Sequence, residues 1–116
     1  AKTENSMKVS VVTAIYRSER ILPSLHGRLT TVLSGMAVDY ELILVDDRSP
    51  DNSWQVMKEL AQADSHVKAV RLCRNFGQHN ALSAGLAQAQ GDYVVMMDCD
   101  LQDEPENIPR MLAKLK

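Results

Sequence analysis

Short apolar runs alternate along this chain with stretches in which apolar residues recur at helical spacing. The runs predict strands buried in a sheet, over residues 9–15, 40–45, 67–73 and 93–97. A first helix is expected to begin near Ser18 or Glu19, because Pro23 is tolerated only within about the first turn. Further helices are expected near residues 54–61, 79–88 and 106–116. This alternation predicts an α/β fold: a mostly parallel sheet with helices on both faces.

Composition narrows the class of protein. The 116 residues carry a net charge of −2 and are 45% hydrophobic, which predicts one folded domain over residues 8–116 behind a flexible tail at 1–7. The slight acidity weighs against a nucleic-acid partner. No apolar run reaches the roughly 18–20 residues of a membrane span, and the polar start AKTENS is no signal peptide. Cys73 and Cys99 lack metal-site spacing and are expected to be reduced thiols in the cytoplasm.

The sharpest chemical feature follows the fourth predicted strand, in the segment 98–103 (DCDLQD). Asp98, Asp100 and Gln102 can converge on one hard cation, and Mg²⁺ or Mn²⁺ prefers such oxygen ligands together with substrate phosphates. The alternative is a solvated acidic loop. An EF-hand fits poorly, since Asp103 stands where that loop needs glycine and Pro109 where it needs glutamate. A phosphatase DxDxT loop is also disfavoured, because Gln102 occupies its fifth position.

A second acidic cluster follows the second predicted strand. Asp46 and Asp47 can accept hydrogen bonds from a base or a ribose, or Asp47 can simply pair with Arg48. For Ser49 and Asp51, capping of the following helix is the favoured interpretation.

The third element is the segment 74–80 (RNFGQHN) after the third predicted strand. Arg74 can meet a phosphate, and Gly77 permits a close backbone approach. His79 is more simply a structural hydrogen-bonding residue. The sequence has no GxGxxG after its first strand, no GxxxxGK[ST] and no GxSxG, which argues against a dinucleotide site, a P-loop and a hydrolase nucleophile.

Four segments in this order resemble the GT-A-fold, inverting, family-two glycosyltransferases: VSVVTAIYRSERIL, ELILVDDRSPDNSWQVM, RNFGQHNALSAGL and DYVVMMDCDLQDEPENIPRML. The third and the DCDLQDEPE part of the fourth are similar to the polyprenyl-phosphate branch of that family. The resemblance implies that Asp98, Asp100 and Gln102 hold a divalent metal with the nucleotide diphosphate, so that Asp98 also belongs to the nucleotide site. It further implies that Tyr16, Asp46 and Asp47 contact the base and ribose, and that Arg74 lines the pocket.

The implied reaction transfers a sugar from a UDP- or GDP-sugar, with inversion, to a polyprenyl phosphate for cell-envelope glycan synthesis at the inner face of a membrane. Such an acceptor is already ionised, so no catalytic base is assigned. The first loop departs from the family pattern, since Arg17 and Ser18 replace the usual Asn and Glu. The chain also ends within a predicted helix, so we expect a donor-binding portion whose open sheet edge favours self-association.

Two other function classes stay open from the sequence. A non-catalytic module of the same fold would bind a nucleotide sugar or a protein without turnover. A receiver-type signalling domain also carries aspartates at strand ends, but its Asp pair should follow the first strand, whereas Asp46 and Asp47 follow the second.

Overall fold

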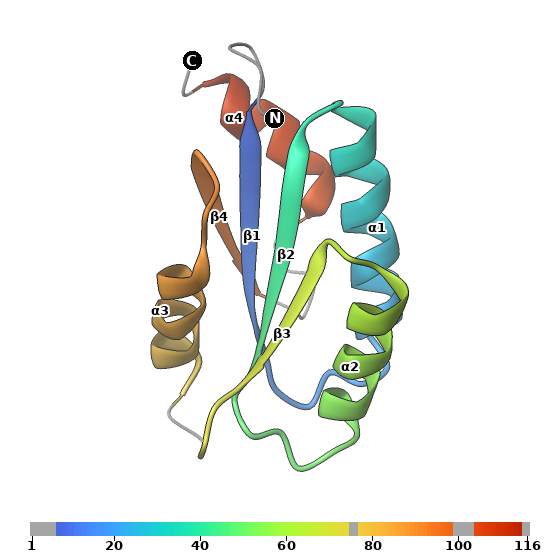
Figure 1. Cartoon of the computed structure of the whole chain (residues 1–116), viewed down its shortest axis with the longest axis vertical. Coiled ribbons are helices and arrows are strands. Elements are labelled where there is room, and N and C mark those ends of the chain that lie inside the picture. Colours follow the sequence, from blue (N-terminus) through green and yellow to red (C-terminus); the bar gives the residue numbers. More distant parts are fainter. Residues whose placement is uncertain (1–6, 75–76, 99–103, 115–116) are drawn as a thin grey trace.

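The computed structural model describes residues 7–74, 77–98 and 104–114, apart from the side chains of His79 and Asp98. The expected tail at 1–7 therefore lies almost entirely outside the described residues. The elements appear in the predicted order (Figure 1): β1 Lys8–Ile15, α1 Leu22–Gly35, β2 Asp39–Asp46, α2 Ser53–Ala63, β3 Val67–Arg71, α3 Gln78–Gln88, β4 Tyr93–Asp98, the 3₁₀ helix η1 Pro105–Asn107 and α4 Ile108–Ala113.

The four described strands form one parallel sheet in the order β3-β2-β1-β4. Val12 in β1 lies opposite Ile43 in β2 and opposite Met96 in β4. Helix α3 covers one face, while α1, α2 and α4 lie on the other (Figure 1). The prediction of a parallel α/β sheet with helices on both faces is confirmed.

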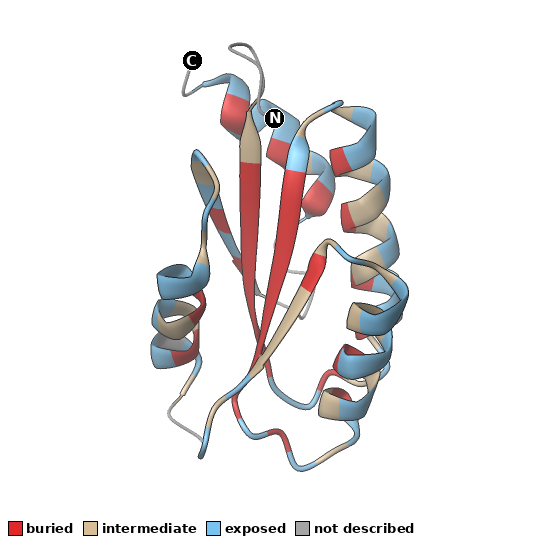
Figure 2. Ribbon diagram, viewed as in Figure 1, coloured by how far each residue is buried: buried red, intermediate tan, exposed pale blue. Residues whose placement is uncertain are grey.

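The core follows the strand alternation, which sends successive side chains to opposite faces. In β1, Val9, Val11 and Ile15 join the larger cluster beneath α1, α2 and α4. Val12 and Ala14 join the smaller cluster, which includes Ala81 of α3. β1 and β2 are buried along most of their length (Figure 2), as central strands covered on both faces must be.

The first helix begins at Leu22, so the expected start at Ser18 or Glu19 was wrong. The carbonyl of Ser18 accepts the amides of Ile21 and Leu22 at 3.1 and 3.0 Å, which makes a separate turn before the helix. The N–H of Ser18 donates to Ser53 Oγ at 3.0 Å and ties that turn to α2. Tertiary contacts of the loop therefore delay the helix.

Two other boundaries differ from the sequence prediction. β3 ends at Arg71 rather than at residue 73, because β2, its hydrogen-bonding partner, ends at Asp46 opposite Arg71. The last helix begins at Ile108 rather than at 106, after the 3₁₀ turn η1. Pro109 has no N–H to donate to the carbonyl of Pro105, so that carbonyl accepts the amide of Ile108 instead.

Within the part of the chain that the structure describes, no helix combines the length and apolarity needed to cross a membrane. Cys73 is an exposed free thiol, and Cys99 lies outside the described residues.

Candidate functional site

The carboxyl ends of the four parallel strands meet at one edge of the sheet, the lower edge in Figure 1. The chain leaves β3 at one side of the sheet and returns as β4 beyond β1, so the strand order reverses between β1 and β4. Ligands of open α/β sheets bind outside the carboxyl ends of the strands at such a reversal. Ala14 of β1 lies opposite Asp98 of β4 there. This edge is the candidate site.

Asp46 ends β2 and is completely buried. Its Oδ1 accepts the backbone N–H of Ser49 at 3.0 Å, and its Oδ2 accepts Nε of Arg71 at 3.1 Å. Both carboxylate oxygens are thus engaged by the protein. The Asp46 side chain holds the turn after β2 against the end of β3.

Asp47, the next residue, is 3% exposed and makes different contacts. Its N–H donates to the carbonyl of Ile15 at 3.0 Å, and its Oδ2 accepts the N–H of Gly77 at 3.0 Å. Gly77 precedes α3 with φ +92°. Asp46 therefore ties the turn to β3, and Asp47 ties it to the start of α3.

Serine and aspartate side chains join the loop after β1 to the loop after β2. Ser49 Oγ accepts the N–H of Arg17 at 2.7 Å and donates to Asp51. Asp51 Oδ1 also accepts the N–H of Ser53, the first residue of α2, at 3.0 Å. Asp51 thus contacts the first amide of α2 from one position before the N-cap residue Asn52, which makes no side-chain capping hydrogen bond. Ser49 Oγ bonds to Arg17 and Asp51 rather than to the helix, so the capping interpretation was wrong for Ser49. Burial alone raises the pKa of Asp51, but these hydrogen bonds outweigh burial and hold the pKa below its usual range.

Both loops contain a non-glycine residue in the left-handed region: φ is +53° at Arg17 and +56° at Arg48. That conformation costs a non-glycine residue roughly 1–3 kcal/mol. The hydrogen bond between Arg17 and Ser49 and the contact of Ser49 with Asp46 hold this part of the edge in one shape.

Tyr16 and Arg74 reach solvent at the same edge. Tyr16 is 40% exposed, and the Arg17 guanidinium lies 5.5 Å from the centre of its ring. Arg74 is exposed in the segment after β3. A flat, accessible aromatic ring and a cation are suitable contacts for a base and a phosphate, respectively.

Of the three predicted metal ligands, Asp98 is placed by its backbone as the last residue of β4. Its side chain, Asp100 and Gln102 lie outside the described residues. The donor types at these positions, two carboxylates and an amide oxygen, fit Mg²⁺ or Mn²⁺. Among the residues that are described, no group of three or more His, Cys, Asp or Glu side chains could hold a metal ion.

Sequence reasoning missed Arg71 and Trp54. Arg71 pairs with Asp46, and its guanidinium lies 5.5 Å from the centre of the Trp54 ring on α2. The available signal was a cation near the end of the predicted strand at 67–73, close to the level at which the neighbouring strand ends in Asp46.

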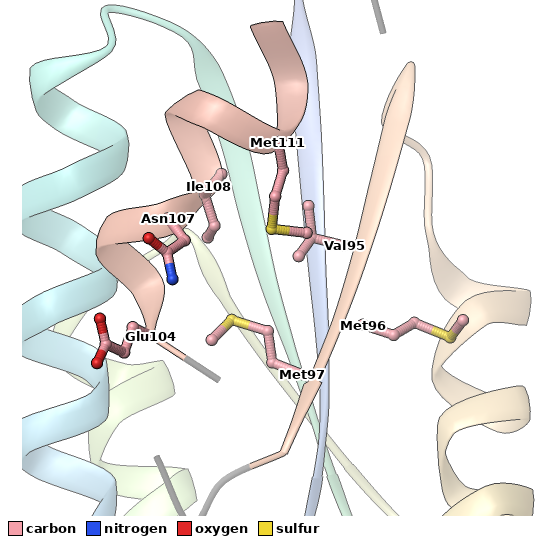
Figure 3. Close-up of a pocket in the computed structure, with 7 residues that line it drawn as sticks. All are labelled: Val95, Met96, Met97, Glu104, Asn107, Ile108 and Met111. Atoms are coloured by element: carbon pink, nitrogen blue, oxygen red, sulfur yellow. The ribbon is translucent and has the colours of Figure 1, made fainter. Parts of the chain in front are cut away.

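The structure also contains a cavity of about 120 Å³ between β4 and the η1–α4 segment (Figure 3). Its lining is mostly apolar and includes Val95, Met97 and Ile108, with Glu104 and Asn107 as the polar members. Met96 also borders the cavity, although its side chain extends toward α3 (Figure 3). Of the predicted nucleotide-site residues whose side chains the structure describes, Tyr16, Asp46, Asp47 and Arg74 do not line this cavity.

Comparison with known proteins decides the family. Residues 10–116 match Glycosyl transferase family 2. The chain belongs to this family. The receiver-type alternative is thereby disfavoured.

Solved structures of glycosyltransferases share the fold. The mannosyltransferase PcManGT from Pyrobaculum calidifontis, in complex with GDP-Man and Mn²⁺, matches 85% of this chain with a TM-score of 0.73 and 20% identity. TarS 1-349 from S. aureus matches 92% with a TM-score of 0.65 and 26% identity, and its complex with UDP-GlcNAc matches 93% with 0.64 and 26%. The expected GT-A-like fold is therefore present. The chain spans only 29%, 32% and 30% of these three chains, respectively.

Proposed function

We propose that this chain forms the donor-binding part of an inverting, metal-assisted glycosyltransferase that uses a nucleotide sugar. The observation that carries the proposal is the pair Asp46 and Asp47 at the carboxyl edge of the sheet, buried and held by contacts on either side. Membership of Glycosyl transferase family 2 supports it, as do similar structures that hold GDP-Man with Mn²⁺ or UDP-GlcNAc.

The proposed site divides the work among its residues. Tyr16 and Asp47 would contact the base and ribose, with Asp46 beneath them at the end of β2, and exposed Arg74 would face the pocket. Asp98, Asp100 and Gln102 would hold Mg²⁺ or Mn²⁺. The metal, when bound, would supply positive charge against the diphosphate as it departs.

The proposed reaction depends on correct positioning of the donor and the acceptor rather than on removal of a proton from the acceptor. We propose a polyprenyl phosphate as the acceptor, and its phosphate oxygen is ionised near neutral pH without help from a side chain. The contribution of this chain is then a rigid, pre-shaped edge that holds the nucleotide. An acceptor of this type would place the full protein at the cytoplasmic face of a membrane.

Calorimetric titration tests the proposal directly. The chain is titrated with UDP and with GDP, each with Mn²⁺ and with EDTA. We expect metal-dependent binding of one nucleotide, which also identifies the base. Absence of binding for both nucleotides contradicts the proposed donor site.

A pair of matched variants locates the site. Asp47→Asn changes the carboxyl edge of the sheet, whereas Asp39→Asn changes an exposed aspartate at the opposite end of the same strand. We expect Asp47→Asn to weaken nucleotide binding and Asp39→Asn to leave it unchanged. Equal effects would argue against a site at the carboxyl edge. A transfer assay with an added lipid phosphate, run on the longer protein, then separates an enzyme from a non-catalytic binding module.

A further inference from the structure

Arg71 has no role in the proposed function, yet it contacts Asp46 at the carboxyl edge of the sheet. It ends β3 directly opposite Asp46, the last residue of β2. Its Nε donates to Asp46 Oδ2 at 3.1 Å, and its guanidinium lies 5.5 Å from the centre of the Trp54 ring. The Arg71 side chain is 37% exposed, while that of Asp46 is fully buried. A cation at the edge of the sheet therefore neutralises a carboxylate beneath the candidate site.

We propose that Arg71 is a positioning residue for nucleotide binding, acting through Asp46 on the loops that carry Tyr16 and Asp47. The inference rests on the proposed function, because it concerns the same nucleotide site. Arg71 itself is not proposed to touch the nucleotide.

The effect of Arg71 on the two loops is transmitted through a continuous series of hydrogen bonds. Arg71 holds one oxygen of Asp46, and the other oxygen accepts the N–H of Ser49 at 3.0 Å. Ser49 Oγ in turn accepts the N–H of Arg17, which has φ +53° and follows Tyr16. The orientation of the Asp46 carboxylate thus influences both loops. Asp47 is the next residue in the chain, so a shift of the Asp46 backbone also moves Asp47.

Loss of Arg71 would leave this carboxylate in an unfavourable environment. A buried charge without its partner either takes up a proton or draws in water, and each change moves the groups bonded to it. Lysine is a poor substitute, because only arginine offers a planar group that can donate to a carboxylate and stack on an aromatic ring together. Both the charge and the shape of Arg71 therefore matter.

The same strand provides a matched control. Lys68 of β3 contacts Glu41 of β2 at 2.6 Å, and its side chain is 42% exposed above a carboxylate that is 3% exposed. The two pairs thus resemble each other in strands and burial. Lys68, however, lies three residues before Arg71 and Glu41 lies five residues before Asp46, so this pair is farther from the carboxyl edge. Because three is an odd number of positions, the side chains of Lys68 and Arg71 lie on opposite faces of the sheet. Loss of the Lys68–Glu41 pair should cost stability without disturbing the loops.

The test compares Arg71→Ala, Arg71→Lys and Lys68→Ala with the unchanged chain. Nucleotide affinity is measured by calorimetry with UDP and GDP in the presence of Mn²⁺, and stability by thermal unfolding. Trp54 is the single tryptophan of the chain, so its fluorescence reports directly on the contact with Arg71.

We expect both Arg71 variants to change the Trp54 emission and to bind nucleotide about tenfold more weakly, a loss typical of removing a group that orients a ligand-contacting residue. Lys68→Ala should be destabilised yet retain affinity and emission. Should Arg71→Ala fail to fold, Arg71→Lys and Asp46→Asn carry the same comparison.

The outcomes separate the two proposals. Nucleotide binding by the Arg71 variants that is equal to that of Lys68→Ala overturns the positioning role and leaves the nucleotide site intact. Failure of the unchanged chain to bind any nucleotide overturns the proposed function, and the positioning role falls with it.

Discussion

The backbone N–H of Gly77 donates to Oδ2 of Asp47 across 3.0 Å and joins residues that are 30 positions apart in the sequence. This hydrogen bond connects the start of α3 to the turn after β2. It depends on a backbone conformation, φ +92° and ψ 154°, that glycine adopts freely and other residues rarely do. The segment after β3 is therefore attached to the candidate site through a position that suits glycine.

Gly77→Ala is expected to weaken nucleotide binding and to destabilise the fold by roughly 1–3 kcal/mol. The cause is backbone strain, since a Cβ at this position would meet nothing within 4 Å. Chemical unfolding and calorimetry with nucleotide measure the two effects. Unchanged affinity together with lowered stability would show that the contact with Asp47 is purely structural.

Gly85→Ala tests how closely α3 packs on the sheet. A Cβ at Gly85 would lie 2.4 Å from Cγ1 of Val12 and 2.9 Å from Cγ2 of Val45, so the helix must shift. We expect a loss of about 1–3 kcal/mol in the free energy of unfolding, measured with urea. Gly27→Ala in α1 is the control, because its Cβ would meet nothing within 4 Å. That control should gain about 0.5–1 kcal/mol from helix propensity, and an equal loss in both variants would contradict the packing argument.

Glu41→Gln should alter stability in acid. Burial alone raises the pKa of Glu41, but hydrogen bonds from Lys68, Ser10 and the Gln90 amide outweigh it and lower the pKa from 4.5 to about 2. Because the folded pKa lies below the unfolded one, the stabilisation is complete above pH ~4.5 and disappears as the pH falls toward ~2.

The measurement is the free energy of unfolding as a function of pH for the two chains. At neutral pH the unchanged chain should be more stable by up to about 3 kcal/mol, and the difference should shrink steadily below pH ~4.5. Glu59→Gln, at an exposed position on α2, controls for the loss of one surface charge. A difference independent of pH would refute the argument.

Asp98→Ala and Asp100→Ala should abolish metal-dependent nucleotide binding while the fold is retained. The reason is the oxygen donor set directly beyond β4, at the reversal in strand order. Titration of UDP or GDP with Mn²⁺ and with EDTA measures the loss, and circular dichroism checks the fold. Glu104→Ala removes an exposed carboxylate from the same acidic stretch and should retain binding. If all three variants behave alike, the stretch acts only through its net charge.

The motifs in the sequence were enough to predict the succession of strands and helices along the chain and the parallel fold class. They also placed Asp46, Asp47 and Asp98 at the ends of strands. Boundaries were less predictable. Helix α1 begins at Leu22 because the preceding turn is held by Ser53, a residue 35 positions from Ser18. No local pattern records such a contact.

The sequence by itself determined which segments form strands and helices, because alternation and helical spacing are local properties of the chain. Only the tertiary structure decided how the two adjacent aspartates differ. Asp46 meets Arg71, 25 positions away, and Asp47 meets Gly77, 30 positions away. These partners are set by the register of β2 with β3 and by the path of the chain from β3 to α3. Adjacent residues with the same side chain thereby acquire different environments.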